Sequence, residues 1–282
     1  MNNFGIICND DVNKVGHLLF NNFKLALINI FKCNLIDIVI PIQIPQHGIK
    51  TLIIIDEHYE PNVKVWRNDE FIKTLNDNKV KVIVFNFERI HNSSFPWNVE
   101  HQKMLERINN LTQFVSDIDD AKLMNKQVIN KQHLSVHTNL DVIPLEKKEN
   151  KVVFIGQVND YYPTRKRVIE QAKKILDMDV VVTDRKLMYK DFLETLNKYK
   201  YVFNPLGTGK FINLRFYEAI TLGCIPIQEI RDDMISWYPE LMHSVNFTSV
   251  DKIDFDKTIV KYDNRYKLED YLKDIKIETY FE

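Results

Sequence analysis

The most informative stretch of the chain is residues 201–227, which read Tyr-Val-Phe-Asn-Pro-Leu-Gly-Thr-Gly-Lys-Phe-Ile-Asn-Leu-Arg-Phe-Tyr-Glu-Ala-Ile-Thr-Leu-Gly-Cys-Ile-Pro-Ile. A short apolar run ends in a turn of proline and glycine, a helix with Arg215 and Glu218 follows, and Gly223 leads into a second apolar run. This order predicts a strand, a loop, a helix and a second strand. In open α/β sheets the loop between a strand and the next helix binds nucleotides and phosphates, because helix-start N–H groups and nearby cations favour an anion. We therefore interpret the loop before Arg215 as a binding loop.

The same alternation of apolar runs and helical patterns extends over the whole chain. The predicted strands cover residues 4–8, 36–44, 51–55, 80–87, 113–116, 151–155, 179–183, 201–203 and 224–227. The predicted helices cover residues 11–31, 68–77, 99–110, 119–131, 163–176, 189–199, 213–222 and 267–280. Short apolar strands that alternate with helices predict parallel sheets buried on both faces. The charged segment 144–150 interrupts this pattern and divides the chain into predicted domains of residues 1–147 and 148–282.

The composition is that of a soluble globular protein, with 45% hydrophobic and 27% charged residues in a chain of 282. A net charge of −1 gives no basic field for coating nucleic acid. No apolar stretch approaches the roughly 18 residues of a membrane span. The three cysteines are widely spaced and the N-terminus lacks the pattern of a signal peptide, so we expect a reducing, cytoplasmic location.

Three motifs within residues 201–227 resemble one family. They are Phe203-x-Pro-x-Gly207, Arg215-x-x-Glu218-Ala219 and Gly223-Cys-Ile-Pro226, which are similar to the donor-nucleotide segment of GT-B glycosyltransferases, especially exostosin-like and spore-coat-type sugar transferases. Residues 151–167 give weaker support, and residues 1–150 lie outside the resemblance. It implies an α/β fold of two Rossmann-like domains facing across a cleft. The second domain would bind the donor, with a terminal helix that crosses back, and the first would bind the acceptor.

The activity implied by the resemblance is transfer of a sugar from a nucleotide diphosphate sugar, such as a UDP-sugar, to a hydroxyl group. A glycan or a lipid-linked saccharide is the expected acceptor. Two alternatives stay open on the sequence alone. A glucosyltransferase acting on a hydroxymethylated base in phage or viral DNA would use the same kind of donor, and a non-catalytic nucleotide-sugar binding module would keep the same motifs.

Arg215 and Glu218 are the first candidates for the donor site. They lie one helical turn apart, so both side chains lie near one face of the helix. A carboxylate can accept hydrogen bonds from two ribose hydroxyls, and an arginine offers a fork of donors to a diphosphate. In the resembled family the glutamate of this motif binds the donor ribose, and Glu218 matches it. The alternative is an ion pair on the surface of the helix.

The loop before this helix offers a second group of donor-site candidates. Gly207, Thr208 and Lys210 combine backbone N–H groups, a hydroxyl and an ammonium, which suits phosphate oxygens, and an ordinary turn is the alternative. Asn204 and Phe211 depart from the P-loop pattern, which excludes an ATPase. Retaining enzymes of the resembled fold often carry a glutamate where this chain has Lys210, so the sequence favours inversion.

Gly156, Arg165 and Arg167 form the third group of donor-site candidates. Gly156 ends a predicted strand, and the two arginines lie at the start of the next helix. The resembled enzymes place a glycine after this strand and a basic residue beyond it, facing the donor diphosphate. A basic helix face exposed to solvent is the alternative.

The transfer also needs a base that removes the proton of the acceptor hydroxyl, and we expect it in the first domain. Asp56 and His58 come directly after a predicted strand, where a parallel sheet presents its carboxyl ends. Glu88 and His91 follow the next strong strand in the same way. Each of these residues can instead be a helix cap, an ion-pair partner or a solvated side chain.

Asp117 and Asp119 form an Asp-x-Asp pattern like that with which GT-A sugar transferases hold Mn²⁺ or Mg²⁺. Acidic residues are also common in the first turn of a helix, where they favour the helix dipole. Because the arginines and Lys210 can neutralise a diphosphate leaving group, we expect neither a metal nor a cofactor beyond the nucleotide sugar.

Overall fold

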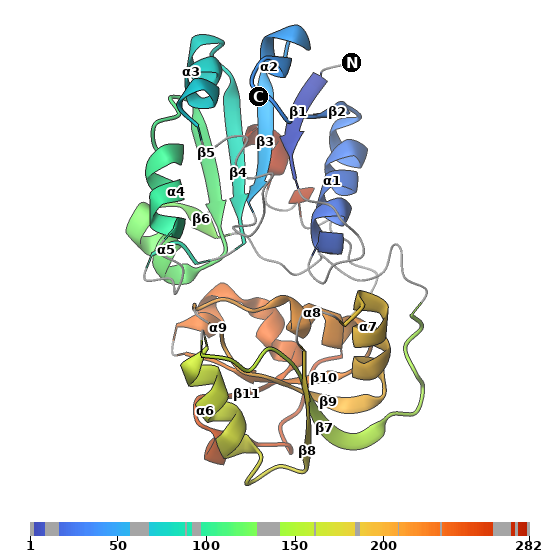
Figure 1. Ribbon diagram of the computed structural model, residues 1–282. Helices are drawn as coiled ribbons and strands as arrows, with labels where there is room; N and C mark the ends of the chain where they lie inside the picture. The colour runs from blue at the N-terminus through green and yellow to red at the C-terminus, as the bar shows by residue number, and fades with distance from the viewer. Residues whose placement is uncertain are drawn as a thin grey trace. The chain divides into compact units, whose positions relative to one another are not determined.

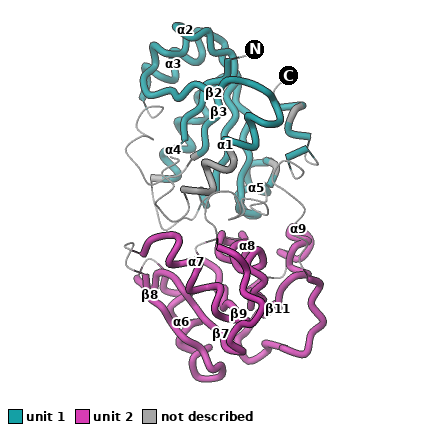
Figure 2. Tube along the Cα trace, turned by 90° about the vertical axis from the view of Figure 1, so that its right-hand side faces the viewer, with its two compact units in different colours: residues 1–11, 19–130, 268–282 teal, residues 12–18, 131–267 magenta. Residues whose placement is uncertain are grey.

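The chain forms two compact units, shown in different colours in Figure 2. Unit 1 consists of residues 1–11, 19–130 and 268–282, and unit 2 consists of residues 12–18 and 131–267. The structure is a computed structural model that describes residues 3–8, 17–56, 68–87, 89–91, 97–128, 142–160, 162–183, 187–207, 209–231, 233–261, 272–273 and 276–280.

Unit 1 contains a parallel sheet of six described strands (Figure 1). They are β1 (Asn3–Ile7), β2 (Asn34–Asp37), β3 (Thr51–Asp56), β4 (Lys81–Asn86), β5 (Leu111–Val115) and β6 (Gln127–Val128), in the order β2-β1-β3-β4-β5-β6. The described helices are α1 (His17–Phe31), α2 (Gln43–Gln46), α3 (Asp69–Asp77), α4 (Trp97–Leu105) and α5 (Ile118–Met124). Phe71 and Leu75 of α3 join Ile54 and Val84 of the sheet in one buried cluster.

Unit 2 contains a second parallel sheet, with five described strands. They are β7 (Glu149–Gly156), β8 (Met178–Val182), β9 (Tyr199–Asn204), β10 (Ile225–Glu229) and β11 (Val245–Phe247), in the order β11-β10-β9-β7-β8. The α-helices are α6 (Pro163–Ala172), α7 (Tyr189–Asn197), α8 (Leu214–Thr221) and α9 (Met234–Trp237). Short 3₁₀ helices follow at η3 (Pro239–His243) and η4 (Val250–Lys252), and η5 (Ile277–Tyr280) belongs to unit 1.

The sheet of unit 2 is buried on both faces, as the continuous apolar runs predict. Successive residues of a strand point to opposite faces. Ile155 of β7 packs with Leu193 of α7 and with Leu222, the residue that follows α8, whereas Phe154 packs with Ile169 of α6. Helices α7 and α8 therefore cover one face of the sheet, and α6 covers the other.

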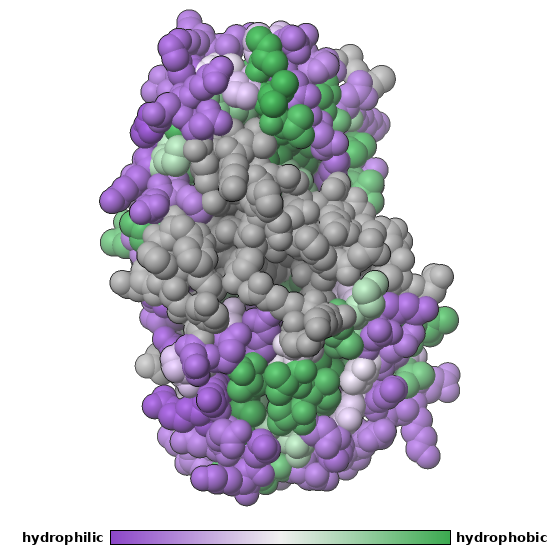
Figure 3. Space-filling model, in the orientation of Figure 1, coloured by the Kyte–Doolittle hydropathy of each residue, from purple (hydrophilic) through white to green (hydrophobic). Residues whose placement is uncertain are grey.

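The edge strand β8 is less buried than the rest of this sheet. Within this strand Val180 is half-buried and Val182 is exposed. Figure 3 shows a compact apolar area on the face of unit 2 that is turned to the viewer. Asp179 of the same strand pairs with Lys151 at 2.6 Å and accepts a hydrogen bond from Tyr199 at 2.9 Å. A charged group beside an apolar edge is a common device against pairing with other chains.

Local chemistry sets several of the helix ends. Asp117 caps α5, because its Oδ1 accepts from the N–H groups of Asp119 at 2.9 Å and Asp120 at 3.1 Å. Asn125 ends the same helix in the left-handed region, with φ 51°. Gly223 turns the chain after α8 with φ 71°, a conformation that favours glycine.

The predicted strand at residues 36–44 is wrong beyond Asp37. The side chain of Gln43 accepts from the N–H groups of Val39 at 2.7 Å and Ile40 at 3.0 Å, which turns the chain into α2. Residues 38–44 therefore form a loop and a short helix in spite of their apolar, β-branched sequence. A nearby side chain accepts the N–H hydrogen bonds that a neighbouring strand would otherwise accept.

Other differences lie at element ends. The predicted helix at residues 99–110 ends at Leu105, and the one at residues 119–131 ends at Met124, before β6. In unit 2 the predicted alternation from β7 to β10 is confirmed, whereas β11 and the short helices after β10 were not predicted. Of the predicted terminal helix, the described part contains η5, whose Tyr280 packs its ring against Phe114 of β5 with centroids 4.9 Å apart.

In both sheets the order in which the chain adds strands reverses once, beside the first strand of the unit. The chain runs outward from β1 to β2, and then from β3 across to β6 on the other side of β1. Unit 2 repeats this order, with the reversal between β7 and β9. Doubly wound sheets bind ligands beyond the carboxyl ends of the two strands that flank such a reversal. In unit 2 these ends are Gly156 and Asn204.

Candidate functional site

The guanidinium of Arg215 lies at the reversal point of the second sheet. Arg215 belongs to the first turn of α8, and its Nη1 donates to Oδ1 of Asn204, the last residue of β9, at 3.1 Å. Its Cζ lies 4.7 Å from the ring centroid of Phe154. A Cβ added to Gly156 would come within 2.3 Å of Nη2, so the glycine at the end of β7 makes room for the arginine.

Arg165 approaches the same edge from the first turn of α6. Its Cζ lies 4.1 Å from the ring centroid of Tyr162, and its Nη1 donates to the carbonyl oxygen of Gln157 at 3.5 Å. A Cβ added to Gly207 would lie 2.9 Å from Nη2 of Arg165. The structure thus brings together four of the residues singled out in the sequence, namely Gly156, Arg165, Gly207 and Arg215.

The charge on Arg215 is unfavourable in the free protein. The pKa of Arg215 is lowered to about 9, because burial and the positive charge of Arg165 lower it more than the charge of Glu218 raises it. The Nε atom of Arg215 has no hydrogen-bond partner in the described part of the chain. An anion placed between the two guanidiniums would reduce the repulsion between their charges and would accept hydrogen bonds from their N–H groups.

Glu218 lies one turn further along α8 and is 2% exposed. Its Oε1 accepts a hydrogen bond from Oη of Tyr189 in α7 at 2.6 Å. The pKa of Glu218 is raised to about 7, because burial raises it more than the Tyr189 hydrogen bond and the charge of Arg215 lower it. A surface ion pair with Arg215 does not describe this residue, because the carboxylate is buried and held by a tyrosine.

Glu229 is a buried carboxylate that the sequence did not suggest. It ends β10, and its Oε2 accepts from the N–H group of Leu206 at 2.8 Å, which fixes the loop that contains Gly207. Burial raises the pKa of Glu229, and the Leu206 N–H group, Arg231, Arg165 and Arg167 lower it. The carboxylate therefore lies close to the positive charges of three arginines, and it also binds the backbone of the loop that contains Gly207.

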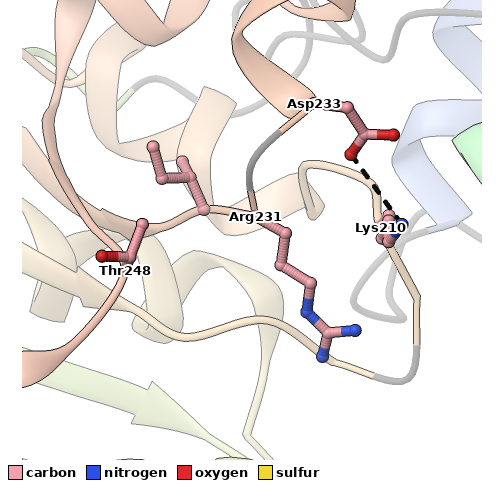
Figure 4. A pocket seen from close by; sticks show the side chains of 5 residues that line it. Lys210, Arg231, Asp233 and Thr248 are labelled. Carbon is pink, nitrogen blue, oxygen red and sulfur yellow. Dashed lines mark ion pairs between the residues drawn. The ribbon is translucent and has the colours of Figure 1, made fainter.

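The remaining basic candidates lie at the margin of this site. Arg167 is exposed on α6, as expected for a basic helix face in solvent. Its positive charge helps to lower the pKa of Glu229. Lys210 pairs with Asp233 at 3.8 Å and lines a hollow of about 480 Å³ together with Ile230, Arg231 and Thr248 (Figure 4). Thr208 lies outside the described residues.

The hollow opens at the same edge of the sheet as the arginine site. Ile230 and Arg231 follow β10 directly, and Thr248 follows β11. In Figure 4 the side chain of Arg231 extends away from the pair of Lys210 and Asp233. The hollow thus presents two cations, one carboxylate and one hydroxyl, a mixture that can bind both hydroxyl and acidic groups.

The catalytic candidates of the first domain are only partly described. The backbone of Asp56 ends β3, at the carboxyl edge of the first sheet, and its side chain lies outside the described part. His58 and Glu88 also lie outside it. Asp117 and Asp119 are described: Asp117 caps α5, and a carboxylate oxygen of Asp119 lies 3.6 Å from Nη2 of Arg89. Among the described residues no group of three or more His, Cys, Asp or Glu side chains could hold a metal ion.

No family model matches the chain, and no curated protein is similar enough to count as a match. Across the described residues, no helix has both the length and the apolar character needed to cross a membrane. The resemblance to the donor segment of sugar transferases therefore rests on the sequence motifs alone.

The buried carboxylate of Glu218 predicts a pH dependence of stability. Its pKa rises from 4.5 to about 7 on folding, so the folded state binds the proton more tightly and the free energy of unfolding falls as the pH rises through this range. We expect Glu218→Gln to remove this fall. Its free energy of unfolding should therefore rise by about 1–3 kcal/mol relative to that of the wild type as the pH is raised from 4.5 to 8. Urea denaturation at a series of pH values measures the difference.

Glu194→Gln is the matched control for this measurement, because Glu194 lies on the exposed side of α7. Its curve of stability against pH should run parallel to that of the wild type. If the curve of Glu218→Gln is also parallel, the carboxylate of Glu218 does not have the raised pKa that its burial implies.

Proposed function

We propose that this protein is a glycosyltransferase that binds a nucleoside diphosphate sugar at the carboxyl edge of the second sheet and transfers the sugar to a hydroxyl group. One observation carries the proposal. Two guanidiniums converge on two glycines at the reversal point of a doubly wound sheet, and a buried carboxylate lies one helical turn away. Phosphates and a ribose are the groups that this combination suits best.

The diphosphate is expected to bind between Arg165 and Arg215. Each guanidinium can donate two parallel hydrogen bonds to phosphate oxygens. Gly156 and Gly207 leave no side chain between the backbone and this anion. Asn213, which precedes α8, makes no side-chain hydrogen bond to the helix start, and the positive end of the helix dipole lies in the same turn as Arg215.

The ribose of the donor is expected to bind to Glu218. A carboxylate is an acceptor, and a ribose offers two neighbouring hydroxyl donors. Because a hydrogen bond to the charged form lowers the pKa of a carboxyl group, ribose binding would favour the ionised state of Glu218. Tyr189 already fixes one oxygen of the carboxylate, so the ribose would meet a group in a defined orientation.

The two doubly wound units also suit the GT-B arrangement, in which one Rossmann-like domain holds the donor and the other holds the acceptor. We assign the donor to unit 2, because the arginine site lies there. The expected acceptor is a glycan or a lipid-linked saccharide. A net charge of −1 gives no support to an acceptor in DNA.

Replacement of Arg215 or Glu218 should weaken donor binding without unfolding the protein. Loss of a hydrogen bond to a charged group costs about 1.5–3 kcal/mol, which corresponds to a rise in Kd of roughly 10- to 150-fold. A thermal-shift panel of UDP-, GDP-, TDP- and CMP-sugars selects the donor, and calorimetry then gives Kd for Arg215→Ala and Glu218→Gln. Arg107→Ala, an arginine of unit 1 that pairs with Asp69, is the matched control.

The donor site is refuted if both site variants fold and bind the selected donor as tightly as the wild type. An effect of equal size in Arg107→Ala would also count against it, because loss of any arginine would then give the same result. Only a selective loss in Arg215→Ala and Glu218→Gln supports the assignment.

We expect turnover to survive chelation of divalent cations. Arg165 and Arg215 can together neutralise the diphosphate that leaves, so the reaction needs no metal for this step. Release of nucleoside diphosphate should be equal with and without EDTA, and Arg165→Ala should lower the rate under both conditions. An enzyme that EDTA silences and Mn²⁺ restores would show that a metal performs this role.

A further inference from the structure

Unit 1 presents a short run of exposed aliphatic side chains between the edge strand β2 and the helix α2. In this apolar segment, residues 39–42, Val39 is 60% exposed, Ile40 51% and Ile42 53%. Within the part of the chain that the structure describes, no other four consecutive residues include three large hydrophobic side chains this exposed. Figure 3 shows apolar side chains gathered at the top of unit 1, in the region of α2. A contiguous group of this kind indicates a surface that contacts a partner.

The fold holds these side chains outward. Ile38 and Ile44, on either side of the apolar segment, are 2% and 0% exposed and pack in the core of the unit. The side chain of Gln43 accepts hydrogen bonds from two backbone N–H groups of the segment, and the N–H group of Ile44 donates to the carbonyl oxygen of Pro41 at 3.0 Å. The segment is therefore fixed at both ends, and a partner that buries its side chains meets a surface that is already ordered.

The sequence around the apolar segment lacks acidic groups. Residues 38–55 contain no Asp or Glu, although the whole chain contains 39 of them. Lys32 and Lys50 are both exposed and lie just before β2 and β3, at the amino edge of the sheet. The carbonyl oxygen of His47, directly after α2, accepts from Nδ2 of Asn3 at 3.4 Å. Because Asn3 begins β1, this contact places the end of α2 at the same edge.

The positive charge continues along this edge of the sheet. The N–H group of Lys81 donates to the carbonyl oxygen of Lys50 at 2.9 Å, so the start of β4 lies beside the start of β3. Lys79, two residues before Lys81, is exposed. The amino edge thus presents several lysines next to the helix that follows the apolar segment.

Two acids that adjoin these segments in the sequence are each paired with a lysine. Asp37, directly before residue 38, lies 2.8 Å from Nζ of Lys24. Asp77, two residues before Lys79, lies 2.5 Å from Nζ of Lys73. This part of unit 1 therefore carries a surplus of positive charge, although the net charge of the whole chain is −1.

We propose that the apolar segment and the adjacent basic edge of unit 1 bind the surface of a lipid bilayer that contains anionic headgroups. The side chains of residues 39–42 enter the boundary between the headgroups and the acyl chains. Lys32, Lys50 and Lys79 lie over the negatively charged headgroups. The contact uses unit 1 alone and is independent of the donor site in unit 2.

Two features favour a bilayer over a protein as the partner. The exposed side chains project from a loop, and a fluid bilayer accepts projecting side chains without a pocket of matching shape. A second copy of the chain docked through the same surface would bring two basic edges together, and like charges at an interface repel. A bilayer with anionic headgroups offers both hydrocarbon and negative charge to the same surface.

Co-sedimentation with vesicles measures the contact. The whole chain is mixed with vesicles of phosphatidylcholine that also contain phosphatidylglycerol, and separately with vesicles of phosphatidylcholine alone. We expect tighter binding to the first kind, and we expect this binding to weaken as salt is added, because salt screens the attraction between charges. A wild-type protein that sediments with neither kind of vesicle overturns the proposal.

The double variant Ile40→Ser/Ile42→Ser tests the apolar part of the surface. Its partition coefficient on vesicles with phosphatidylglycerol should fall about tenfold or more, because two aliphatic side chains no longer enter the hydrocarbon. Ile235→Ser/Met242→Ser is the matched control, since these side chains of unit 2 are 59% and 54% exposed. The control should bind like the wild type, and an equal loss in both variants would contradict a docking surface at residues 39–42. Circular dichroism checks that each variant folds.

The double variant Lys32→Gln/Lys50→Gln tests the basic part. Each lysine near an anionic surface strengthens binding about fivefold, so we expect about 25-fold weaker binding to vesicles with phosphatidylglycerol. Binding to phosphatidylcholine alone should not change. Lys173→Gln/Lys190→Gln removes the same charge from exposed positions of unit 2 and should leave both values as they are. If the control loses as much, net charge and not this edge attracts the protein, and the proposal fails.

Light scattering in solution distinguishes the other possible partners. The wild type and Ile40→Ser/Ile42→Ser are expected to have the same mass. A wild-type dimer that the variant abolishes would show that a second copy covers the surface, which overturns the bilayer. A wild-type monomer that binds no vesicle would leave the surface to a different protein, with the same consequence.

Discussion

The close approach of the Arg215 guanidinium to Gly156 is the contact on which the account of this protein depends. It requires a glycine at the end of β7, an aromatic face from Phe154 beneath the cation, and the amide oxygen of Asn204 beside it. Each of these groups belongs to a strand that flanks the reversal of the sheet. The contact therefore places a cation where a doubly wound sheet binds its ligand.

Stability of the free protein does not account for this arrangement. Burial and the neighbouring Arg165 both act against the charge on Arg215, and burial acts against the charge on Glu218. Groups whose pKa values are displaced by burial and by like charges are common in binding and catalytic sites, where a ligand supplies the missing interactions. A diphosphate beside the arginines and a ribose beside Glu218 would supply both.

Helix α8 connects this site to the core of unit 2. Ala219 and Leu222 pack into the buried cluster beneath β7 and β9, on the helix face that follows the 3.6-residue period. The same helix carries Arg215 and Glu218 in its first two turns. Packing of the apolar residues therefore fixes the orientation of the polar ones. The fold and the candidate site share one element, which explains why one stretch of sequence pointed to both.

The sequence allowed much of unit 2 to be predicted, because buried parallel strands and amphipathic helices have clear periods. Gly156, Arg165, Gly207 and Arg215 were all singled out, since glycine at a strand end and arginine at a helix start carry a local signal. Tyr189 and Glu229 carried none.

In the sequence Tyr189 cannot be told from an aromatic residue of the core, although it binds Glu218 in the structure. Glu229 binds the loop that precedes α8 only because β10 lies beside that loop in the folded chain. In unit 1 the side chain of Gln43 ended a predicted strand, and the contact between Asp120 and His91 joins residues 29 positions apart. Such contacts depend on tertiary structure and have no fixed spacing in sequence.

The most direct measurement is a crystal structure of the protein with the nucleoside diphosphate of its selected donor. The account predicts that the diphosphate oxygens lie within hydrogen-bond distance of the guanidiniums of Arg165 and Arg215, at the ends of β7 and β9, and that Glu218 accepts from the ribose. A nucleotide bound elsewhere, with both guanidiniums still facing each other without an anion, would contradict it.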